Sequence, residues 1–149
     1  MKKVAIAVFA VLMIVVVSVA YFAFQQPNTV QIRFAGIVLS VELATTQAEQ
    51  ERGLSGRNSM PADHGMLFIF GAQGNWSFWM YEMKFPLDII WFNSNRQVVF
   101  IEQNLEPCTP NECPTFTPNA NAMYVLEVNA GFVTAHDVSM GDVFTFVLP

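Results

Sequence analysis

The alternation of apolar and polar side chains over residues 30–43 is the feature that most constrains the fold of this chain. Val30, Ile32 and Phe34 alternate with polar neighbours, and a two-residue period resumes after Ala35-Gly36. Side chains with this period lie on opposite faces of a β-strand. Two such runs around a two-residue turn that contains glycine predict a β-hairpin with one buried face.

Further short apolar segments, separated by turn residues, continue to the C-terminus and predict a mainly β domain. They cover residues 66–70, 76–80, 86–92, 97–101, 123–128 and 143–148. The first of them is continuously apolar, which is typical of a strand buried on both sides. Thr46 and Glu49 have the spacing of a capping box, and Gly53 follows, so we expect a helix over residues 47–52. Seven to nine short strands with one short helix predict a single β-sandwich or partly closed barrel.

An apolar run precedes this domain. Lys2 and Lys3 are followed by residues 4–24, which as a helix would be roughly 31 Å long, about the thickness of the bilayer hydrocarbon. We interpret residues 1–24 as an uncleaved signal anchor or as a signal peptide cut after Ala20. Residues 25–29 form a linker, and residues 30–149 form the domain. Because of the lysines, both interpretations place the domain on the periplasmic or extracellular side of the cytoplasmic membrane, and cleavage would secrete it.

The two cysteines, Cys108 and Cys113, are expected to form a disulfide, because pairs this close become oxidised outside the cytoplasm. Four residues separate them, whereas a thioredoxin-type redox centre has two. A zinc site would need two further ligands nearby, and the sequence offers none. The pair is therefore interpreted as a structural disulfide on a long loop.

The charge balance limits the partners of the domain. From Gln25 onward it has five basic and twelve acidic residues, a formal net charge of −7, and no basic run. Nucleic acid is therefore not an expected partner. The membrane, through the N-terminal helix, and a small ligand or an envelope protein are the expected partners.

Several motifs occur in a fixed order along the domain. They are Glu51–Leu54 with Arg57, then residues 61–68, 78–80 and 86–90, then the two cysteines with their flanking prolines, then residues 124–127 with Gly131, and finally residues 141–142. This series resembles domain-of-unknown-function family 192, a bacterial and archaeal family that is usually exported, over about Val30 to Val147. The resemblance implies a compact jelly-roll-like β domain and supplies no catalytic residue.

The sequence departs from the family pattern at two places. Ser55-Gly56 stands where the family usually has a methionine and an aromatic residue. Tyr81, Glu82 and Met83 stand where the family typically has lysine, asparagine and threonine. A polar ligand pocket at that position would therefore differ in this member.

Four residues are candidates for ligand binding: Arg57, Trp79, Glu82 and Asp88. Asp88 interrupts an apolar strand, so it either contacts a ligand or is a structural carboxylate that accepts backbone N–H groups or pairs with Arg57. Arg57 is either an anion clamp beside Trp79 or the partner of Asp88, Glu82 or Glu127 in a salt bridge.

The aromatic cluster at residues 76–81 gives a second reason to expect a binding surface around Trp79. Alternation assigns Trp76, Phe78 and Met80 to one face and Trp79 and Tyr81 to the other. The second pair would form a stacking platform for sugar rings or a partner, or would cover the edge of a second core.

His64, Met66 and Met80 are a minor alternative as soft ligands for copper. Methionines in an apolar chain are usually gap fillers, and we expect no metal or cofactor.

Three functions remain open. The first is a non-enzymatic, extracytoplasmic, membrane-tethered binding or accessory domain. The second is a small hydrolase that uses Asp88 with Glu82 or Glu127, although no recognisable catalytic motif supports it. The third is a structural partner in envelope assembly.

Overall fold

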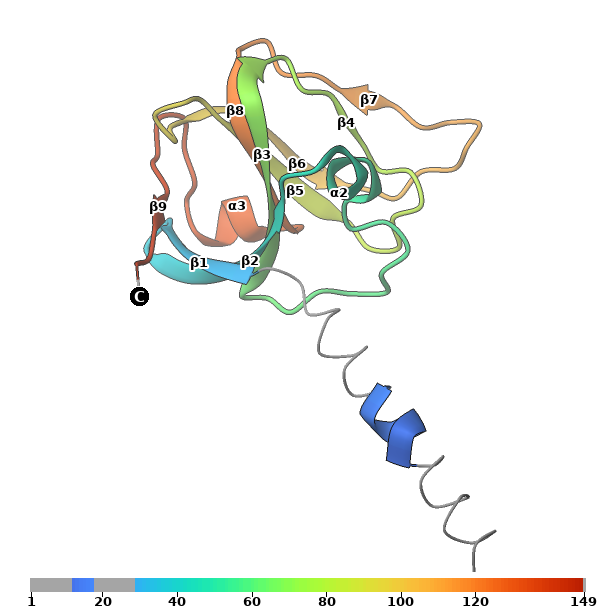
Figure 1. The fold of residues 1–149 in the computed structure, drawn as a ribbon. Helices are drawn as coiled ribbons and strands as arrows, with labels where there is room; N and C mark the ends of the chain where they lie inside the picture. The colour runs from blue at the N-terminus through green and yellow to red at the C-terminus, as the bar shows by residue number, and fades with distance from the viewer. Residues whose placement is uncertain (1–11, 18–28, 149) are drawn as a thin grey trace, which may run out of the picture.

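The computed structural model describes residues 12–17 and 29–148 (Figure 1). Most of the apolar run and the linker at residues 25–28 lie outside these ranges. Residues 12–17 are helical. Within the described ranges, no helix has both the length and the apolar character needed to cross a membrane.

The predicted hairpin is confirmed. Strands β1 (Thr29–Phe34) and β2 (Ile37–Ala44) pair antiparallel, with Phe34 opposite Ile37. Ala35 and Gly36 form the turn with φ values of 49° and 80°. Positive φ at both turn residues is the type I′ geometry, whose twist matches that of the flanking strands.

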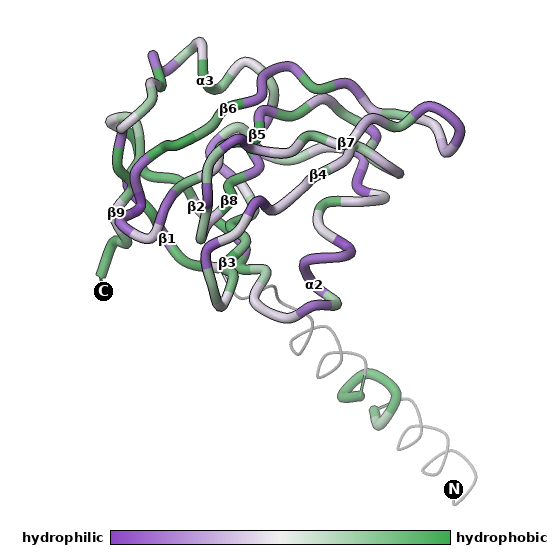
Figure 2. The backbone as a smooth tube through the Cα atoms, turned by 90° about the horizontal axis from the view of Figure 1, so that it is seen from above, coloured by the Kyte–Doolittle hydropathy of each residue, from purple (hydrophilic) through white to green (hydrophobic). Residues whose placement is uncertain are grey.

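The predicted helix is also confirmed, as α2 (Gln47–Arg52). The Thr46 hydroxyl accepts the Glu49 N–H at 3.3 Å, and the Glu49 carboxylate accepts the Thr46 N–H at 2.9 Å. This reciprocal pair satisfies two of the free N–H groups at the helix N-terminus. None of the six residues is fully buried, and all but Ala48 are hydrophilic (Figure 2). It therefore covers a neighbouring surface and does not cross the core.

The other elements complete one large sheet and one small one (Figure 1). They are β3 (His64–Gly74), β4 (Phe78–Trp79), β5 (Leu87–Phe92), β6 (Val98–Leu105), β7 (Thr115–Phe116), β8 (Ala122–Asn129), α3 (Phe132–Ala135) and β9 (Thr145–Phe146). The large sheet has the order β6-β5-β8-β3-β2-β1-β9, and β4 pairs only with β7.

The expectation of a mainly β domain is confirmed, but the sheet is mixed. β2 and β3 run parallel, because the chain returns through α2 and a loop before it enters β3. This differs from the antiparallel sheets of a jelly roll. The two edges of the sheet approach through a bridge between Gln97 and Val143, and no closed barrel forms.

Both faces of the central strands are buried. The first core includes Ile32, Phe34, Leu67, Ile90, Leu126, Val133 and Phe144. The second core lies on the opposite face and includes Leu54, Met66, Phe68, Ile89, Trp91 and Val125. All six residues of β5 are buried, so this strand has no solvent face. Helix α2 and the β4–β7 pair lie over the second core.

Gly65 in β3 permits the close approach of β8. A Cβ atom there would lie 2.8 Å from the Glu127 carbonyl oxygen and 3.2 Å from a Leu126 methyl group. Gly71, in the same strand, has no heavy atom within 4 Å of its Cβ position. The two glycines therefore form a matched pair for testing the packing of the sheet.

We expect Gly65→Ala to lower the free energy of unfolding by about 1–3 kcal/mol, because the backbone of β8 must move. Gly71→Ala should change it by less than about 0.5 kcal/mol. Urea denaturation of both variants measures this difference. Equal stabilities would contradict the tight β3–β8 contact.

Candidate functional site

A pocket of about 280 Å³ lies between α2 and the segment that leads into β4. Side chains from β3 and β8 also line it. Its lining combines five aromatic rings with polar groups of α2 and one acidic side chain from the sheet. These are Phe68, Phe70, Trp76, Phe78 and Trp79, Gln47, Gln50, Glu51 and Arg52, and Glu127. This volume suits a ligand of about one ring, because pockets for drug-sized ligands begin near 300 Å³.

Glu127 is the unusual group in this pocket. It points from β8 to the face of the second core and is only 4% exposed. Its Oε2 atom is buried and has no hydrogen-bond partner among the described residues. Burial raises the pKa of Glu127 to about 8, with Arg57 acting in the opposite direction. At neutral pH this side chain is therefore mainly an uncharged carboxylic acid, which can both donate and accept a hydrogen bond.

Arg57 is close enough to affect Glu127 but is bonded elsewhere. Its guanidinium forms two hydrogen bonds to the Glu42 carboxylate, of which Nη2 to Oε2 is 2.8 Å. This pairing raises the pKa of Arg57. The register places Glu42 opposite Met66 and Met66 opposite Glu127, so both carboxylates project from the same face. Glu42 thus neutralises Arg57, and Glu127 remains unpaired.

The aromatic rings differ in what they offer a ligand. Phe70 and Trp76 stack on each other with their centroids 4.1 Å apart. Phe78 meets Phe68 edge to face at 4.8 Å. Trp79 is 57% exposed and has a tilted contact with Tyr81. Trp79 is therefore the lining ring with the most accessible surface.

Trp76 carries the second unpaired polar atom of the pocket. Its indole Nε1 is buried and has no hydrogen-bond partner among the described residues. Its carbonyl oxygen accepts the Trp91 indole N–H at 2.8 Å, which fixes the backbone against β5. Two residues that line the pocket, Trp76 and Glu127, thus each carry a buried polar atom without a partner among the described residues.

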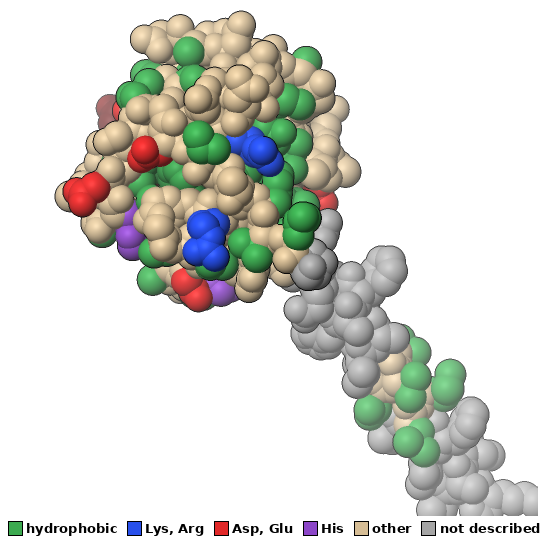
Figure 3. All heavy atoms as spheres, turned by 90° about the vertical axis from the view of Figure 1, so that its left-hand side faces the viewer, with side chains coloured by type: hydrophobic (Ala, Val, Ile, Leu, Met, Phe, Trp, Pro, Cys, Tyr) green, Lys and Arg blue, Asp and Glu red, His purple; other side chains and the backbone are tan. Residues whose placement is uncertain are grey.

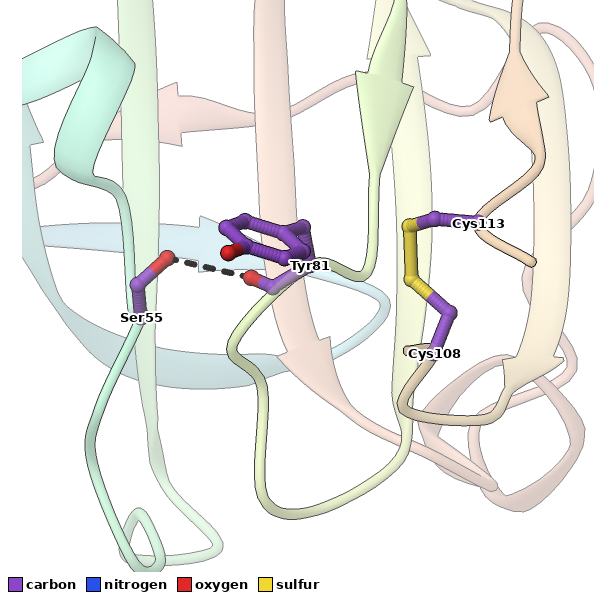
Figure 4. The surroundings of a disulfide bond; sticks show 4 residues. All are labelled: Ser55, Tyr81, Cys108 and Cys113. Atoms are coloured by element: carbon purple, nitrogen blue, oxygen red, sulfur yellow. Dashed lines mark hydrogen bonds between the residues drawn. A yellow bond between two sulfur atoms is a disulfide. The ribbon is translucent and has the colours of Figure 1, made fainter. Parts of the chain in front are cut away.

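The β4 wall is held in place on both sides just beyond Trp79 (Figure 4). The Ser55 hydroxyl donates to the Tyr81 carbonyl at 3.3 Å, and the Gly56 N–H donates to the Glu82 carbonyl at 3.0 Å. On the other side, the Cys108 N–H donates to the Met80 carbonyl at 3.3 Å. Cys108 and Cys113 form the expected disulfide. The disulfide loop therefore helps to position one wall of the pocket.

Asp88 has a structural environment. It is fully buried, and its two oxygens accept the N–H groups of Asn104 and Val133, each at 2.8 Å. In the β5–β8 pairing Asp88 lies opposite Val128, whereas its neighbour Ile89 lies opposite Glu127. Asp88 and Glu127 therefore point to opposite faces of the sheet, and Asp88 lies in the first core.

The structure does not bring the four candidate residues together. Trp79 lines the pocket, Arg57 is bound to Glu42, Asp88 lies on the other face, and Glu82 is an exposed residue with φ of 58°. Glu127 was considered from the sequence only as a partner of Asp88 or Arg57. The signal that could have found it is the one that marked Asp88, an acidic residue within an apolar strand.

The three residues of the minor copper alternative lie in or near the second core. His64 Nδ1 lies 2.9 Å from the Asp63 carboxylate, while Met66 and Met80 are buried in the second core. Among residues 12–17 and 29–148, no three His, Cys, Asp or Glu side chains are grouped as metal ligands.

The sequence of this fold matches a known family. The model of domain-of-unknown-function family 192, described as "Uncharacterized ACR", matches residues 30–146. The chain belongs to this family. The UPF0127 protein of Thermococcus gammatolerans is 31% identical over 108 residues, which are 71% of this chain and 65% of that protein. The UPF0127 protein of Thermococcus kodakarensis is 29% identical over 108 residues, which are 71% of this chain and 64% of that protein. The matched region is thus somewhat less than two thirds of these relatives.

Two crystal structures are similar to this one. A protein of Sinorhizobium meliloti 1021, named a "putative transcription regulator (R01717)", has 32% identity and a TM-score of 0.75, covering 81% of this chain and 95% of that one. A protein of unknown function from Novosphingobium aromaticivorans has 30% identity and a TM-score of 0.71, covering 80% and 85%. Neither name identifies a ligand.

Glu127 should make stability depend on pH. Its pKa is about 8 in the folded chain, against 4.5 for an ordinary glutamate. Below about pH 4.5 Glu127 is protonated in both the folded and the unfolded state, and its raised pKa contributes fully to the free energy of unfolding. Between these values only the unfolded state releases the proton, so stability falls as pH rises through the folded pKa, by at most about 1.4 kcal/mol per pH unit.

Glu127→Gln removes this titration. We expect its stability relative to the wild type to rise between about pH 5 and about pH 8. Thermal unfolding of both proteins across this range measures the difference, with Glu106→Gln at an exposed position as the control. Parallel pH profiles for the wild type and Glu127→Gln would show that Glu127 is not buried in this way.

Proposed function

We propose that this chain is a non-enzymatic binding domain, held outside the cytoplasmic membrane by its N-terminal segment, whose small ligand occupies the pocket beside α2. The observation that carries the proposal is the unpaired, 4% exposed carboxyl of Glu127 in the wall of that pocket. A buried polar group without a partner costs free energy. A ligand that supplies the partner recovers this energy, so the pocket favours an occupant.

Binding agrees better with the arrangement of the carboxylates than hydrolysis does. A hydrolase of the expected kind would need Asp88 and a second carboxyl on opposite sides of one substrate. Both Asp88 oxygens accept backbone N–H groups, and Glu127 points to the other face of the sheet. Glu82 is exposed and does not line the pocket.

The proposed location rests on the lysines and the apolar run at the N-terminus and on the disulfide. Nucleic acid is not part of the proposal, although one structural relative is named as a regulator of transcription. The chain has a net charge of −5. On the face drawn in Figure 3, the Lys and Arg side chains lie apart and form no patch. A DNA-binding surface needs a concentration of positive charge.

A screen of small compounds against the full chain in detergent tests the pocket. Saccharides, organic amines, carboxylates and aromatic compounds are suitable classes. A true ligand at a hundred times its Kd adds about 2.7 kcal/mol of stability, which raises the Tm by several degrees. Trp79→Ala should reduce this shift, and Met140→Ala, at an exposed position that does not line the pocket, should not. If no class gives a shift that depends on Trp79, the pocket is not a small-ligand site.

Membrane fractionation, together with protease treatment of cells whose cytoplasmic membrane is exposed but intact, tests the tether. We expect the chain to stay in the membrane after an alkaline wash and the domain to be digested from outside without lysis. A variant with Lys2 and Lys3 both changed to Glu is the control, because it removes the charge bias that sets the orientation. Protection of the wild-type domain until lysis would contradict an outside location, and its release by the wash would favour cleavage over anchoring.

A further inference from the structure

Two residues that line the pocket carry unpaired polar atoms of different character. Trp76 Nε1 can only donate a hydrogen bond, and the Glu127 carboxyl accepts one when ionised and can donate one when protonated. A cationic ligand would leave the indole donor unpaired because an ammonium group has no acceptor. An anionic ligand can accept hydrogen bonds from the indole and from protonated Glu127, but an ionised Glu127 repels it. A hydroxyl group both donates and accepts, so it can satisfy either group in either state.

The charges around the pocket also favour an uncharged ligand. Glu51 and Arg52 of α2 both line it and have opposite charges. Arg57, from the loop after α2, is paired with Glu42 of β2. Burial raises the pKa of Glu127 to about 8, so this side chain adds little charge at neutral pH. The lining therefore presents no excess of either sign to a charged ligand.

The aromatic rings leave one large surface for stacking. Trp76 stacks on Phe70, and Phe78 packs edge to face against both Phe68 and Trp91. Trp79 alone among the five lining rings is more than half exposed. An exposed indole offers a broad apolar face beside polar groups, which suits a ring that has an apolar face and hydroxyl edges.

We propose that the ligand of this pocket is an uncharged hydroxylated ring, a saccharide unit, that stacks on Trp79 and hydrogen-bonds with Glu127 and Trp76. This assignment rests on the binding function proposed above. Both polar atoms have almost no exposed surface in the structure, so small rotations of the two side chains accompany binding. The volume of about 280 Å³ limits the bound part to about one ring.

The test is a titration of the full chain, in detergent, with the methyl glycosides of glucose, galactose, mannose and N-acetylglucosamine, followed by tryptophan fluorescence and thermal shift. Choline is the cationic probe and acetate the anionic one. We expect at least one glycoside to bind and both ions to fail. A linear trisaccharide of the sugar that binds best then distinguishes a free sugar from one unit of a polysaccharide. If it binds as well as the glycoside, the ring belongs to a polymer, and if it is excluded, the ligand is a free sugar; both results support the class.

Substitutions at Glu127 and Trp79 separate the ligand classes. Glu127→Gln keeps an uncharged donor and acceptor of similar size, so glycoside affinity should stay within about threefold. Glu127→Leu keeps the volume but removes both hydrogen-bonding functions, and Trp79→Ala removes the stacking face. Each should weaken binding about tenfold or more, and Met140→Ala should not.

Two results would overturn the assignment. If choline binds and Glu127→Gln abolishes its binding, the pocket takes an organic cation. If acetate binds and the glycosides do not, it takes an anion. In both cases the binding function stands and only the class is wrong. If none of these probes binds, the saccharide class fails, and the wider screen decides whether the pocket binds another compound. Thermal unfolding of each variant confirms that it is folded.

Discussion

Burial of the central strands on both faces is the constraint on which the rest of the structure depends. β5 is buried at all six positions, β8 is buried at five of eight, and β3 is buried from Gly65 to Phe68. A sheet with two apolar faces needs a cover on each. The curved sheet and α3 enclose the first core, while α2 and the β4–β7 pair cover the second. Because α2 has only six residues and β4 only two, this second cover is incomplete, and the pocket lies between them.

Asp88 and Glu127 show how one sequence signal can have two physical outcomes. Each is an acidic residue in a buried strand, and each is nearly inaccessible to solvent. Asp88 receives two backbone N–H groups and thereby connects β5 to β6 and to the first turn of α3. Glu127 Oε2 receives none within the described structure. Asp88 is explained by the fold alone, whereas Glu127 calls for an explanation outside the fold.

Local interactions account for what the sequence could predict. The hairpin turn and the capping box involve residues no more than a few positions apart, and both were predicted with their residues. Alternation placed Trp79 on the face opposite Phe78 but left open whether that face was exposed, and the structure shows Trp79 exposed. The parallel pairing of β2 and β3 was not predictable, because it depends on where a loop of about ten residues returns the chain. The resemblance to antiparallel jelly rolls pointed elsewhere.

The candidate site was harder to predict because it depends on register between distant strands. A one-residue change in register moves a side chain to the other face of a sheet. In a strand buried on both sides, such as β5, hydrophobicity gives no indication of which face a residue occupies. The sequence therefore grouped Asp88 with Trp79 and Arg57, and it could not show that Arg57 has its own partner in Glu42.

The cost of Glu127 to the fold supports a role in binding. An apolar side chain of similar size at this position would avoid the desolvation of a carboxyl. The neighbouring cation offsets only part of this cost, because Arg57 forms two hydrogen bonds with Glu42. The β4 wall of the pocket is at the same time fixed by hydrogen bonds from Ser55, Gly56 and Cys108. A rigid wall beside an unpaired polar group reduces the conformational entropy lost when a ligand binds. A ligand that hydrogen-bonds with Glu127 would therefore recover the free energy that this unpaired group costs the folded protein.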